Sequence, residues 1–246
     1  MQAVILAAGT GSRLKPMTES IPKALVPVAG KPLLAYTLAF ARLAGCDEIT
    51  VVVGAFGEKV RSFLSSVGLL EENWVENPDY LIGNLYSLGA AQKEIHTDFL
   101  LLNTDHIYDR NIAGKVRSQC TDLVAFCDHD RKLGADDMKV ALNPAGRLGG
   151  ISKQLESYDR GYVGMTFCPA RLMKTYFQAF DRVAEKYGDK AVVEMVLGDL
   201  ADNGCPPAIG DISGVGWLEI DTPEEHAAAE VEIKADAGRF SALEPA

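Results

Sequence analysis

The sequence has little cysteine, and no spacing that would organise it. Its 5 cysteines are scattered, their number is odd, and no two of them form a CxxC arrangement. This pattern argues against a disulfide framework or a zinc site and is typical of a protein from a reducing compartment. We therefore expect the cysteines to be small buried side chains.

Long hydrophobic runs are also missing. The longest mostly apolar segment, residues 32–41, is too short to cross a bilayer. The residues after Met1 already read as a strand, without the basic region, apolar stretch and cleavage site of a signal peptide. These observations predict a cytoplasmic protein that does not bind membranes.

Positive charge is in the minority. The chain has 24 lysines and arginines against 34 aspartates and glutamates, which gives a formal net charge of −10. Such a surface repels polyanions, so the composition argues against extended nucleic-acid binding. A compact basic cluster inside a cleft still fits a small phosphate ligand, because a local field can differ in sign from the net charge.

Apolar runs alternate with helical patterns over the first half of the chain. The alternation predicts right-handed βαβ units, and so a three-layer α/β/α sandwich around a mostly parallel, Rossmann-like sheet. The strongest run, residues 98–103, is almost wholly apolar, as expected of a strand buried on both faces. In this half we expect strands at residues 2–7, 48–53, 73–77, 98–103 and 122–127, and helices at 32–44, 58–66, 85–95 and 112–118.

The pattern changes after residue 127. Glycine turns now separate short strands, which predicts a small antiparallel or mixed β lobe appended to the parallel sheet. No repeat, low-complexity tract or clean linker is visible, so residues 1–246 are expected to form one domain. The elements expected here are strands at 139–142, 148–153, 162–168, 208–212 and 215–220, and helices at 169–186, 191–203 and 223–234.

The first strand runs into a glycine-rich loop that carries positive charge. Ligands of open α/β sheets bind beyond the carboxyl ends of the strands, where glycines let backbone N–H groups approach phosphate oxygens. Gly9 and Gly11 have this position, and Arg13 and Lys23 follow. The loop lacks the third glycine of a dinucleotide fingerprint, which disfavours a nicotinamide oxidoreductase, and it is not a Walker A motif. Taken alone, the glycines could equally form a structural turn.

Two aspartates follow predicted strands. Asp105 comes soon after the strand at 98–103, and Asp221 ends the segment WLEID. Each could be a helix cap or a ligand of a hard cation. Mg²⁺ takes one or two carboxylates and completes its shell with phosphate oxygens and water, so these two would suffice. Strand alternation puts Glu219 on the same face as Asp221.

Residues 6–34, LAAGTGSRLKPMTESIPKALVPVAGKPLL, resemble the first segment of the nucleotidyltransferases that activate sugar phosphates and other phosphomonoesters. The family pattern LAAGxGxRLxPxTxxxPKxLxxxxGKPLL is matched at nearly every position. The resemblance implies that Arg13 is a catalytic residue at the triphosphate and that Lys23 contacts the α-phosphate and its acceptor. The nucleotide-binding positions that it implies in this part of the site are Ala7, Ala8, Gly9, Gly11 and Thr104.

The chain also resembles the cytidylyltransferase branch of this superfamily. WLEIDTPEE at residues 217–225 is similar to the WxEIDTPED segment of that branch and departs from it only at Glu225. Residues 76–88 resemble the N…NxYSL segment of phosphocholine and inositol-1-phosphate cytidylyltransferases. In this reading Asn84 would contact the pyrimidine edge, although it could equally be a helix N-cap. The acceptor-binding residues implied by the branch are Lys153, Gly164 and Glu219.

Aromatic residues could in principle bind the other end of the acceptor. Trp74, Tyr86, Tyr162 and Trp217 could form part of a cage for a quaternary ammonium, although each is more commonly a core residue. His106 is expected to support Asp105, because a phosphate acceptor is already ionised and needs no base.

The resemblance implies transfer of CMP from CTP to a small phosphomonoester, similar to phosphocholine or inositol-1-phosphate, with release of pyrophosphate and with Mg²⁺ as cofactor. Residues 1–127 would bind the nucleotide, 128–222 the acceptor, and 223–246 would form a terminal helix and tail. The alternatives are a uridylyl-, guanylyl- or thymidylyltransferase for a sugar-1-phosphate, or a non-catalytic nucleotide-binding regulator. We expect a monomer or homodimer.

Overall fold

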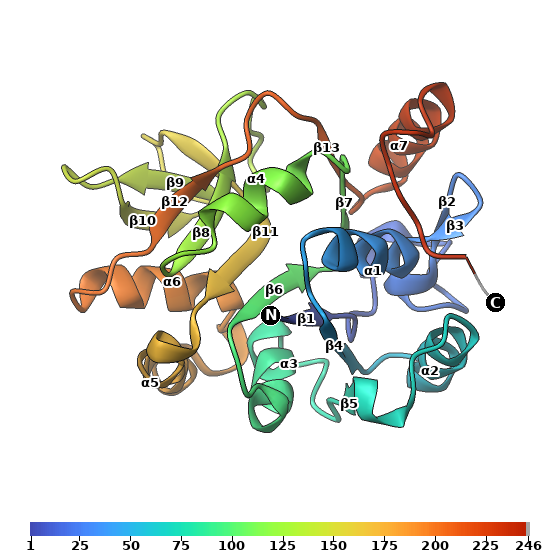
Figure 1. Cartoon of the computed structure of the whole chain (residues 1–246), viewed down its shortest axis with the longest axis horizontal. Coiled ribbons are helices and arrows are strands. Elements are labelled where there is room, and N and C mark those ends of the chain that lie inside the picture. The colour runs from blue at the N-terminus through green and yellow to red at the C-terminus, as the bar shows by residue number, and fades with distance from the viewer. Residues whose placement is uncertain (245–246) are drawn as a thin grey trace.

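The computed structural model describes residues 1–244 of the chain, and its strands run through the centre of the molecule (Figure 1). Each strand of the first half is short and largely apolar, as the sequence predicts. The strands are β1 (Gln2–Leu6), β2 (Pro27–Val28), β3 (Lys31–Pro32), β4 (Glu48–Val53), β5 (Trp74–Glu76), β6 (Phe99–Asn103), β7 (His106–Tyr108), β8 (Val124–Asp128), β9 (Lys139–Leu142), β10 (Leu148–Ser152), β11 (Arg160–Cys168), β12 (Ala208–Asp211) and β13 (Trp217–Glu219).

Nine of these strands form one sheet. Its main path runs β10-β9-β11-β6-β1-β4-β5, and β8 pairs with β11 and β12 beside that path. β1 is parallel to β4 and β6, and β4 is parallel to β5. β11 runs antiparallel to β6, β8 and β9, so the predicted mixed β lobe is present and is continuous with the parallel sheet through β11.

Helices cover both faces of the sheet, which confirms the predicted three-layer sandwich. Apolar residues of α1, α2 and α4 pack in one buried cluster, and those of α3, α5 and α6 pack in the other. α7 lies apart from both, against the small ribbons. The helices are α1 (Leu33–Leu43), α2 (Gly57–Ser66), α3 (Asn84–Ala91), α4 (Ile112–Gln119), α5 (Ala170–Tyr187), α6 (Val193–Asp202) and α7 (Pro223–Ala235).

β6 is apolar along most of its length because both of its faces are covered by helices. Leu100 and Leu102 point into the cluster under α1, α2 and α4, whereas Phe99 and Leu101 point into the cluster under α3, α5 and α6. Successive side chains of a strand alternate between the faces, so a strand with helices on both sides must be apolar at every position. The loop that follows Asn103 therefore leaves the sheet at the end of a buried strand.

Two small ribbons contain three strands that the sequence analysis missed, β2, β3 and β7, whereas β13 lies within the strand expected at residues 215–220. β7 begins at His106 and pairs antiparallel with β13, with Glu219 opposite His106. β2 and β3 form a second short ribbon. Because β2, β3 and β7 have only two or three residues each, they carry too little periodicity to be predicted from the sequence. The β7–β13 ribbon brings the two segments that hold Asp105 and Asp221 side by side.

The structure shows the state of the cysteines and the character of the helices. All five cysteines are free; Cys46, Cys127 and Cys168 are buried as predicted, whereas Cys120 and Cys205 are partly exposed. Within residues 1–244, no helix combines the length and the apolar character needed to span a membrane.

Leu101→Ala tests whether β6 is the core strand. The side chain is 2% exposed, so truncation should lower the free energy of unfolding by about 2–5 kcal/mol through lost burial and a cavity. Urea denaturation measures this. Leu70→Ala removes the same atoms from a side chain that is 62% exposed and should change stability by less than about 0.5 kcal/mol. Equal effects of the two changes would contradict this role for β6.

Candidate active site

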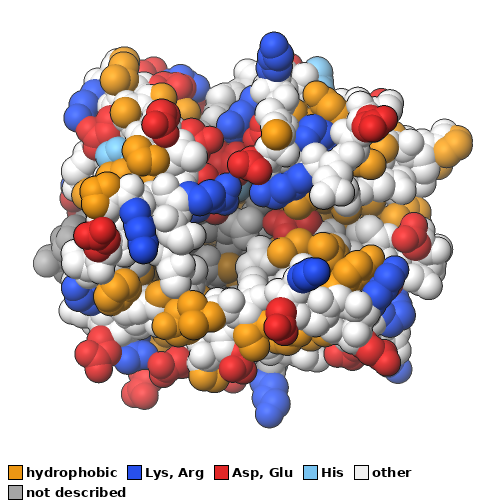
Figure 2. Space-filling view, turned by 180° about the vertical axis from the view of Figure 1, so that it is seen from behind, with side chains coloured by type: hydrophobic (Ala, Val, Ile, Leu, Met, Phe, Trp, Pro, Cys, Tyr) orange, Lys and Arg blue, Asp and Glu red, His pale blue; other side chains and the backbone are white. Residues whose placement is uncertain are grey.

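The carboxyl ends of β1 and β6 open onto two adjoining cavities. We call the first the loop cavity; it has a volume of about 250 Å³ and is lined by Gly9 to Arg13 of the glycine-rich loop. We call the second the lobe cavity; it has a volume of about 270 Å³ and extends toward Lys153 and Tyr162 of the β lobe. A charged hollow is visible near the centre of the molecular face in Figure 2. The residues shared by both cavities are Arg13, Asn84, Asn103, Asp105 and Asp221.

The structure brings nearly all of the predicted site residues to these cavities. Ala7 is the exception: it is buried, and its N–H donates to the carbonyl of Val52 at 2.9 Å. The carried-over contact of Ala7 with a nucleotide therefore has no exposed side chain or free N–H to support it. The predicted residues that line the loop cavity are Ala8, Gly9, Gly11, Arg13, Lys23, Asn84, Thr104, Asp105 and Asp221, and those that line only the lobe cavity are Lys153, Gly164 and Glu219.

A compact ion cluster lies where the cavities meet. The Nζ atom of Lys23 is 2.7 Å from Oδ2 of Asp105 and also donates to Oδ1 of Asp221. The guanidinium of Arg13 donates to the other oxygen of Asp221 at 2.6 Å. The carboxylates of two segments, one after β6 and one after β13, therefore converge on one cationic group.

The ion cluster shifts the pKa values of Lys23 and Asp105. Burial by itself would lower the pKa of Lys23, but the adjacent carboxylates outweigh burial and raise it. Burial likewise opposes ionisation of Asp105, yet Lys23 and His106 hold the pKa of this carboxyl well below its usual range. The opposite charges of this cluster stay in a partly buried place because they compensate one another.

The glycine-rich loop is folded so that Lys23 can reach the ion cluster. Gly11 has φ +68, and a Cβ atom there would lie 2.8 Å from the Cβ of Lys23 and 2.9 Å from the methyl carbon of Thr18. The Thr18 hydroxyl donates to the carbonyl of Gly11 at 2.7 Å. Glycine at this position therefore combines a left-handed backbone with close approach of the next turn.

Asp221 is held in place by the start of α7. The sequence left open that Asp221 is the N-cap of this helix, and that alternative is wrong: Thr222 is the N-cap, with Pro223 following it. Oε2 of Glu225 accepts from the N–H groups of Asp221 at 2.8 Å and Thr222 at 3.0 Å, and the Thr222 hydroxyl accepts from the Glu225 N–H. This capping box leaves the Asp221 carboxylate free for the ion cluster.

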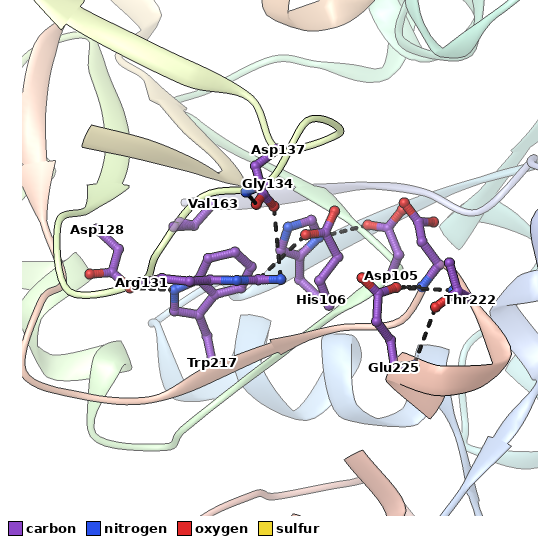
Figure 3. A network of polar contacts seen from close by, with 12 residues as sticks. Asp105, His106, Asp128, Arg131, Gly134, Asp137, Val163, Trp217, Thr222 and Glu225 are labelled. Carbon is purple, nitrogen blue, oxygen red and sulfur yellow. Dashed lines mark hydrogen bonds and ion pairs between the residues drawn. The ribbon is translucent and has the colours of Figure 1, made fainter. Parts of the chain in front are cut away.

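His106 supports Asp105 from the lobe side. Its Nδ1 atom is 2.6 Å from Oδ1 of Asp105, and Asp105 is the group that raises the pKa of His106 against the opposing effect of burial. The ring of His106 stacks on Trp217 with centroids 5.2 Å apart. Figure 3 shows Arg131 lying across the other side of Trp217, whose Nε1–H donates to Asp128 at 2.7 Å. His106 thus has a packed ring and one fixed acceptor.

Gly164 makes the close approach to His106 possible. It has φ +66, and a Cβ atom there would lie 2.7 Å from Cε1 of the His106 ring. Tyr108 fixes the adjoining backbone by donating its hydroxyl to the carbonyl of Val163 at 2.7 Å. The structure therefore gives Gly164 a supporting position behind His106 as well as a place on the wall of the lobe cavity.

Asn84 has a contact that the sequence could not show. It is the first residue of α3 and not its N-cap, which is Gly83, so the alternative of an N-cap is wrong. Oδ1 of Asn84 accepts from the N–H of Val193 at 3.1 Å, at the first turn of α6. Its amide nitrogen is thus the group available for further donation, and base recognition by Asn84 stays a prediction.

Sequence reasoning missed several residues of the cavity walls. Glu194 is 8% exposed, belongs to the first turn of α6 and lines the lobe cavity. Asn103, the last residue of β6, lines both cavities. Glu194 falls within the helix expected at residues 191–203, and no motif distinguishes it. The other wall residues that were not predicted are Leu6, Thr10, Ser12, Tyr80, Gly83, Ser87, Asp136, Met138 and Val192.

The arrangement of these groups defines a class of protein. A Rossmann-like sheet carries a glycine-rich loop, two basic side chains and two converging carboxylates at the carboxyl ends of its strands, which is the geometry of a nucleotide-binding α/β protein. The chain matches the family model described as the MobA-like NTP transferase domain over residues 3–134, just over half of its length. The chain belongs to this family.

Relatives and solved structures agree with this membership. A bifunctional IPC transferase and DIPP synthase from Aquifex aeolicus is 32% identical over 91% of this chain and 49% of the relative. A CMP-5'-(3-aminopropyl)phosphonate synthase from Streptomyces rubellomurinus is 30% identical over 94% of the chain and 38% of the relative. The chain therefore spans about half the length, or less, of these curated relatives.

The fold is also that of two solved structures. The inositol-1-phosphate CTP transferase from T. maritima superposes with a TM-score of 0.76, at 22% identity and over 96% of each chain. The CTP:phosphocholine cytidylyltransferase from Streptococcus pneumoniae gives a TM-score of 0.76, at 24% identity, over 94% of this chain and 98% of that one. At these identities the likeness carries the fold alone.

Gly164→Ala tests the close approach behind His106. The added methyl group meets the ring and a left-handed backbone, so the free energy of unfolding should fall by about 1–3 kcal/mol. Gly150→Ala, on β10, is the control, since nothing lies within 4 Å of a Cβ atom there. Thermal unfolding followed by circular dichroism compares the two variants. An unchanged melting temperature for Gly164→Ala would show that the ring does not need this space.

Proposed function

We infer that this chain transfers CMP from CTP to a small phosphorylated acceptor and releases pyrophosphate. The observation that carries the inference is the position of the Lys23 ammonium between Asp105 and Asp221, where the loop cavity meets the lobe cavity. A charge cluster at the junction of two cavities is placed to act on a bond between two bound ligands. The triphosphate would occupy the loop cavity and the acceptor the lobe cavity.

The reaction is a displacement at the α-phosphorus of the nucleotide. An acceptor oxygen, already ionised, attacks this phosphorus, the bond to the bridging oxygen of the β-phosphate breaks, and pyrophosphate leaves. Such chemistry depends on alignment and charge neutralisation more than on covalent help from the protein. Arg13 and the N–H groups of the glycine-rich loop would hold the triphosphate, and Lys23 would stabilise charge that builds up on the α-phosphate.

The two aspartates fit a magnesium ion. They converge on a single cation, the Lys23 ammonium, and two carboxylates are what Mg²⁺ takes when phosphates and water complete its shell. Within residues 1–244 no cluster of three or more His, Cys, Asp or Glu forms a closed metal cage, so the ion would depend on the nucleotide for its other ligands. When bound, it would supply positive charge to the phosphate oxygens.

Several observations support CTP over other nucleotides. A choline-phosphate cytidylyltransferase from Streptococcus pneumoniae is 36% identical over 44% of this chain, and another relative is named for a CMP-linked product. The amide group of Asn84 at the cavity wall is a donor suited to the carbonyl oxygen of a pyrimidine. The cytoplasmic location and a monomer or homodimer stay predictions from the sequence.

A pyrophosphate-release assay tests the function. The purified chain is incubated with Mg²⁺ and each of CTP, UTP, GTP and dTTP, against a panel of phosphorylated acceptors that includes sugar-1-phosphates. We expect release with CTP and a small phosphomonoester or phosphonate. Release only with UTP, GTP or dTTP and a sugar-1-phosphate would overturn the base assignment in favour of a sugar nucleotidyltransferase.

Lys23→Ala should reduce turnover by about 10²-fold or more, because it removes a charge that stabilises the transition state. Loss of the ammonium also leaves Asp105 with only His106 and Asp221 with only Arg13 as a partner, so substrate-free stability is measured in parallel. The control is Lys93→Ala, which removes an exposed lysine of the short 3-10 helix Gln92–Glu94. Turnover of Lys23→Ala close to that of the Lys93 variant would remove Lys23 from the mechanism.

A further inference from the structure

Within residues 1–244, the lobe cavity contains one carboxyl group that has no cationic partner, that of Glu194. Its other acidic groups have cationic partners: Asp105 and Asp221 bind Lys23, and Glu219 lies 3.4 Å from NH1 of Arg131. Asp136 is 3.8 Å from NH1 of Arg13. Among residues 1–244, no lysine, arginine or histidine forms an ion pair with Glu194, which is the most buried of the cavity's glutamates.

Glu194 lies at the start of a helix that borders the lobe cavity. It stands in the first turn of α6, where the helix dipole favours a negative charge. Burial raises the pKa of its carboxyl group, and the nearby amide side chains of Asn84 and Asn103 oppose that rise. Both amides line the lobe cavity beside the carboxylate, whereas Glu194 is absent from the wall of the loop cavity. The side chain therefore serves the acceptor's side of the site and not the nucleotide's.

The aromatic residues of the site do not form a cage. Of the four aromatics that the sequence offered for this purpose, Tyr162 alone lines the lobe cavity. Trp217 has Arg131 across one face, 4.5 Å from the ring centroid, and the ring of His106 stacked at 5.2 Å. A quaternary ammonium is bound by several open aromatic faces, and one is not enough. A primary ammonium differs, because it donates hydrogen bonds and pairs directly with a carboxylate.

We propose that the acceptor carries a primary ammonium, which Glu194 binds, at one end of a short chain, and a phosphate or phosphonate at the other. The proposal rests on the cytidylyl transfer inferred above and names the acceptor class for that same site. Lys153, exposed at the rim of the lobe cavity, and Arg13, at its junction with the loop cavity, supply the positive charge for the phosphorus end. One cavity thus offers cations to one end of the ligand and an anion to the other.

The test compares acceptors that differ only in the amine. With CTP and Mg²⁺ saturating, kcat/KM is measured by pyrophosphate release for 2-aminoethylphosphonate and for ethylphosphonate. Phosphoethanolamine, phosphocholine and inositol-1-phosphate complete the panel, so that phosphonate and phosphate sources of the same chemistry are distinguished. We expect each primary amine to exceed its counterpart without one by about 10- to 100-fold, as for loss of one charge-assisted hydrogen bond.

Glu194→Gln supplies the second arm. It keeps the shape of the side chain and removes the charge, so kcat/KM for the amino acceptor should fall by about 10- to 100-fold, with the KM for CTP unchanged. The preference for the amino acceptor over ethylphosphonate should then disappear. Glu185→Gln, an exposed glutamate on α5, is the matched control and should leave all constants unchanged.

The outcomes separate the proposal from the function that it rests on. Absence of pyrophosphate release from CTP with every acceptor would contradict the cytidylyl transfer itself. Release with inositol-1-phosphate or phosphocholine at equal or higher kcat/KM would overturn the amine proposal and leave the transfer reaction standing. A Glu194→Gln variant that changes the KM for CTP, but not the discrimination between acceptors, would assign Glu194 to the nucleotide. The comparison of acceptors on the unmodified chain holds even if this variant fails to fold.

Discussion

The ion cluster of Lys23 with Asp105 and Asp221 is the interaction on which the rest of the site depends. Asp105 follows β6, Asp221 follows β13, and Lys23 reaches them from the far end of the glycine-rich loop. Separately, each charge would be costly in a partly buried place; together they compensate one another. The parallel sheet, the β7–β13 ribbon and the capped helix α7 together position these three side chains next to one another.

A second set of contacts holds the two aspartates of the ion cluster in position. His106 fixes Asp105, and Gly164 lets the β lobe approach His106. The capping box of Thr222 and Glu225 takes up the N–H of Asp221 and so orients its carboxylate. These supporting residues come from β7 in the first half of the chain and from β11 and α7 in the second half. The site therefore depends on contacts between the two halves. An NTP transferase of this family would need such coupling, since its two substrates must meet at one phosphorus atom.

Much of this architecture could be predicted from the sequence. The apolar run of β6 marks a strand with helices on both faces, and the loop from Gly9 to Lys23 carries a long motif. Contacts between distant short segments could not be predicted. β7 has three residues and no periodicity, and its pairing with β13 depends on the completed sheet. No sequence motif marks Glu194. Asn84 and Asn103 are far from it in the sequence and come close to it only through the packing of α3, β6 and α6.

The central claim is that two bound ligands are joined at the ion cluster. Phosphorus-31 NMR of the purified chain with CTP, Mg²⁺ and a phosphorylated acceptor observes this directly. The account predicts that signals of CTP decline while those of pyrophosphate and of a new anhydride, linking CMP to the acceptor's phosphorus, grow in equal amounts. Hydrolysis of CTP without the linked product, or no change in either ligand with any acceptor, would contradict it.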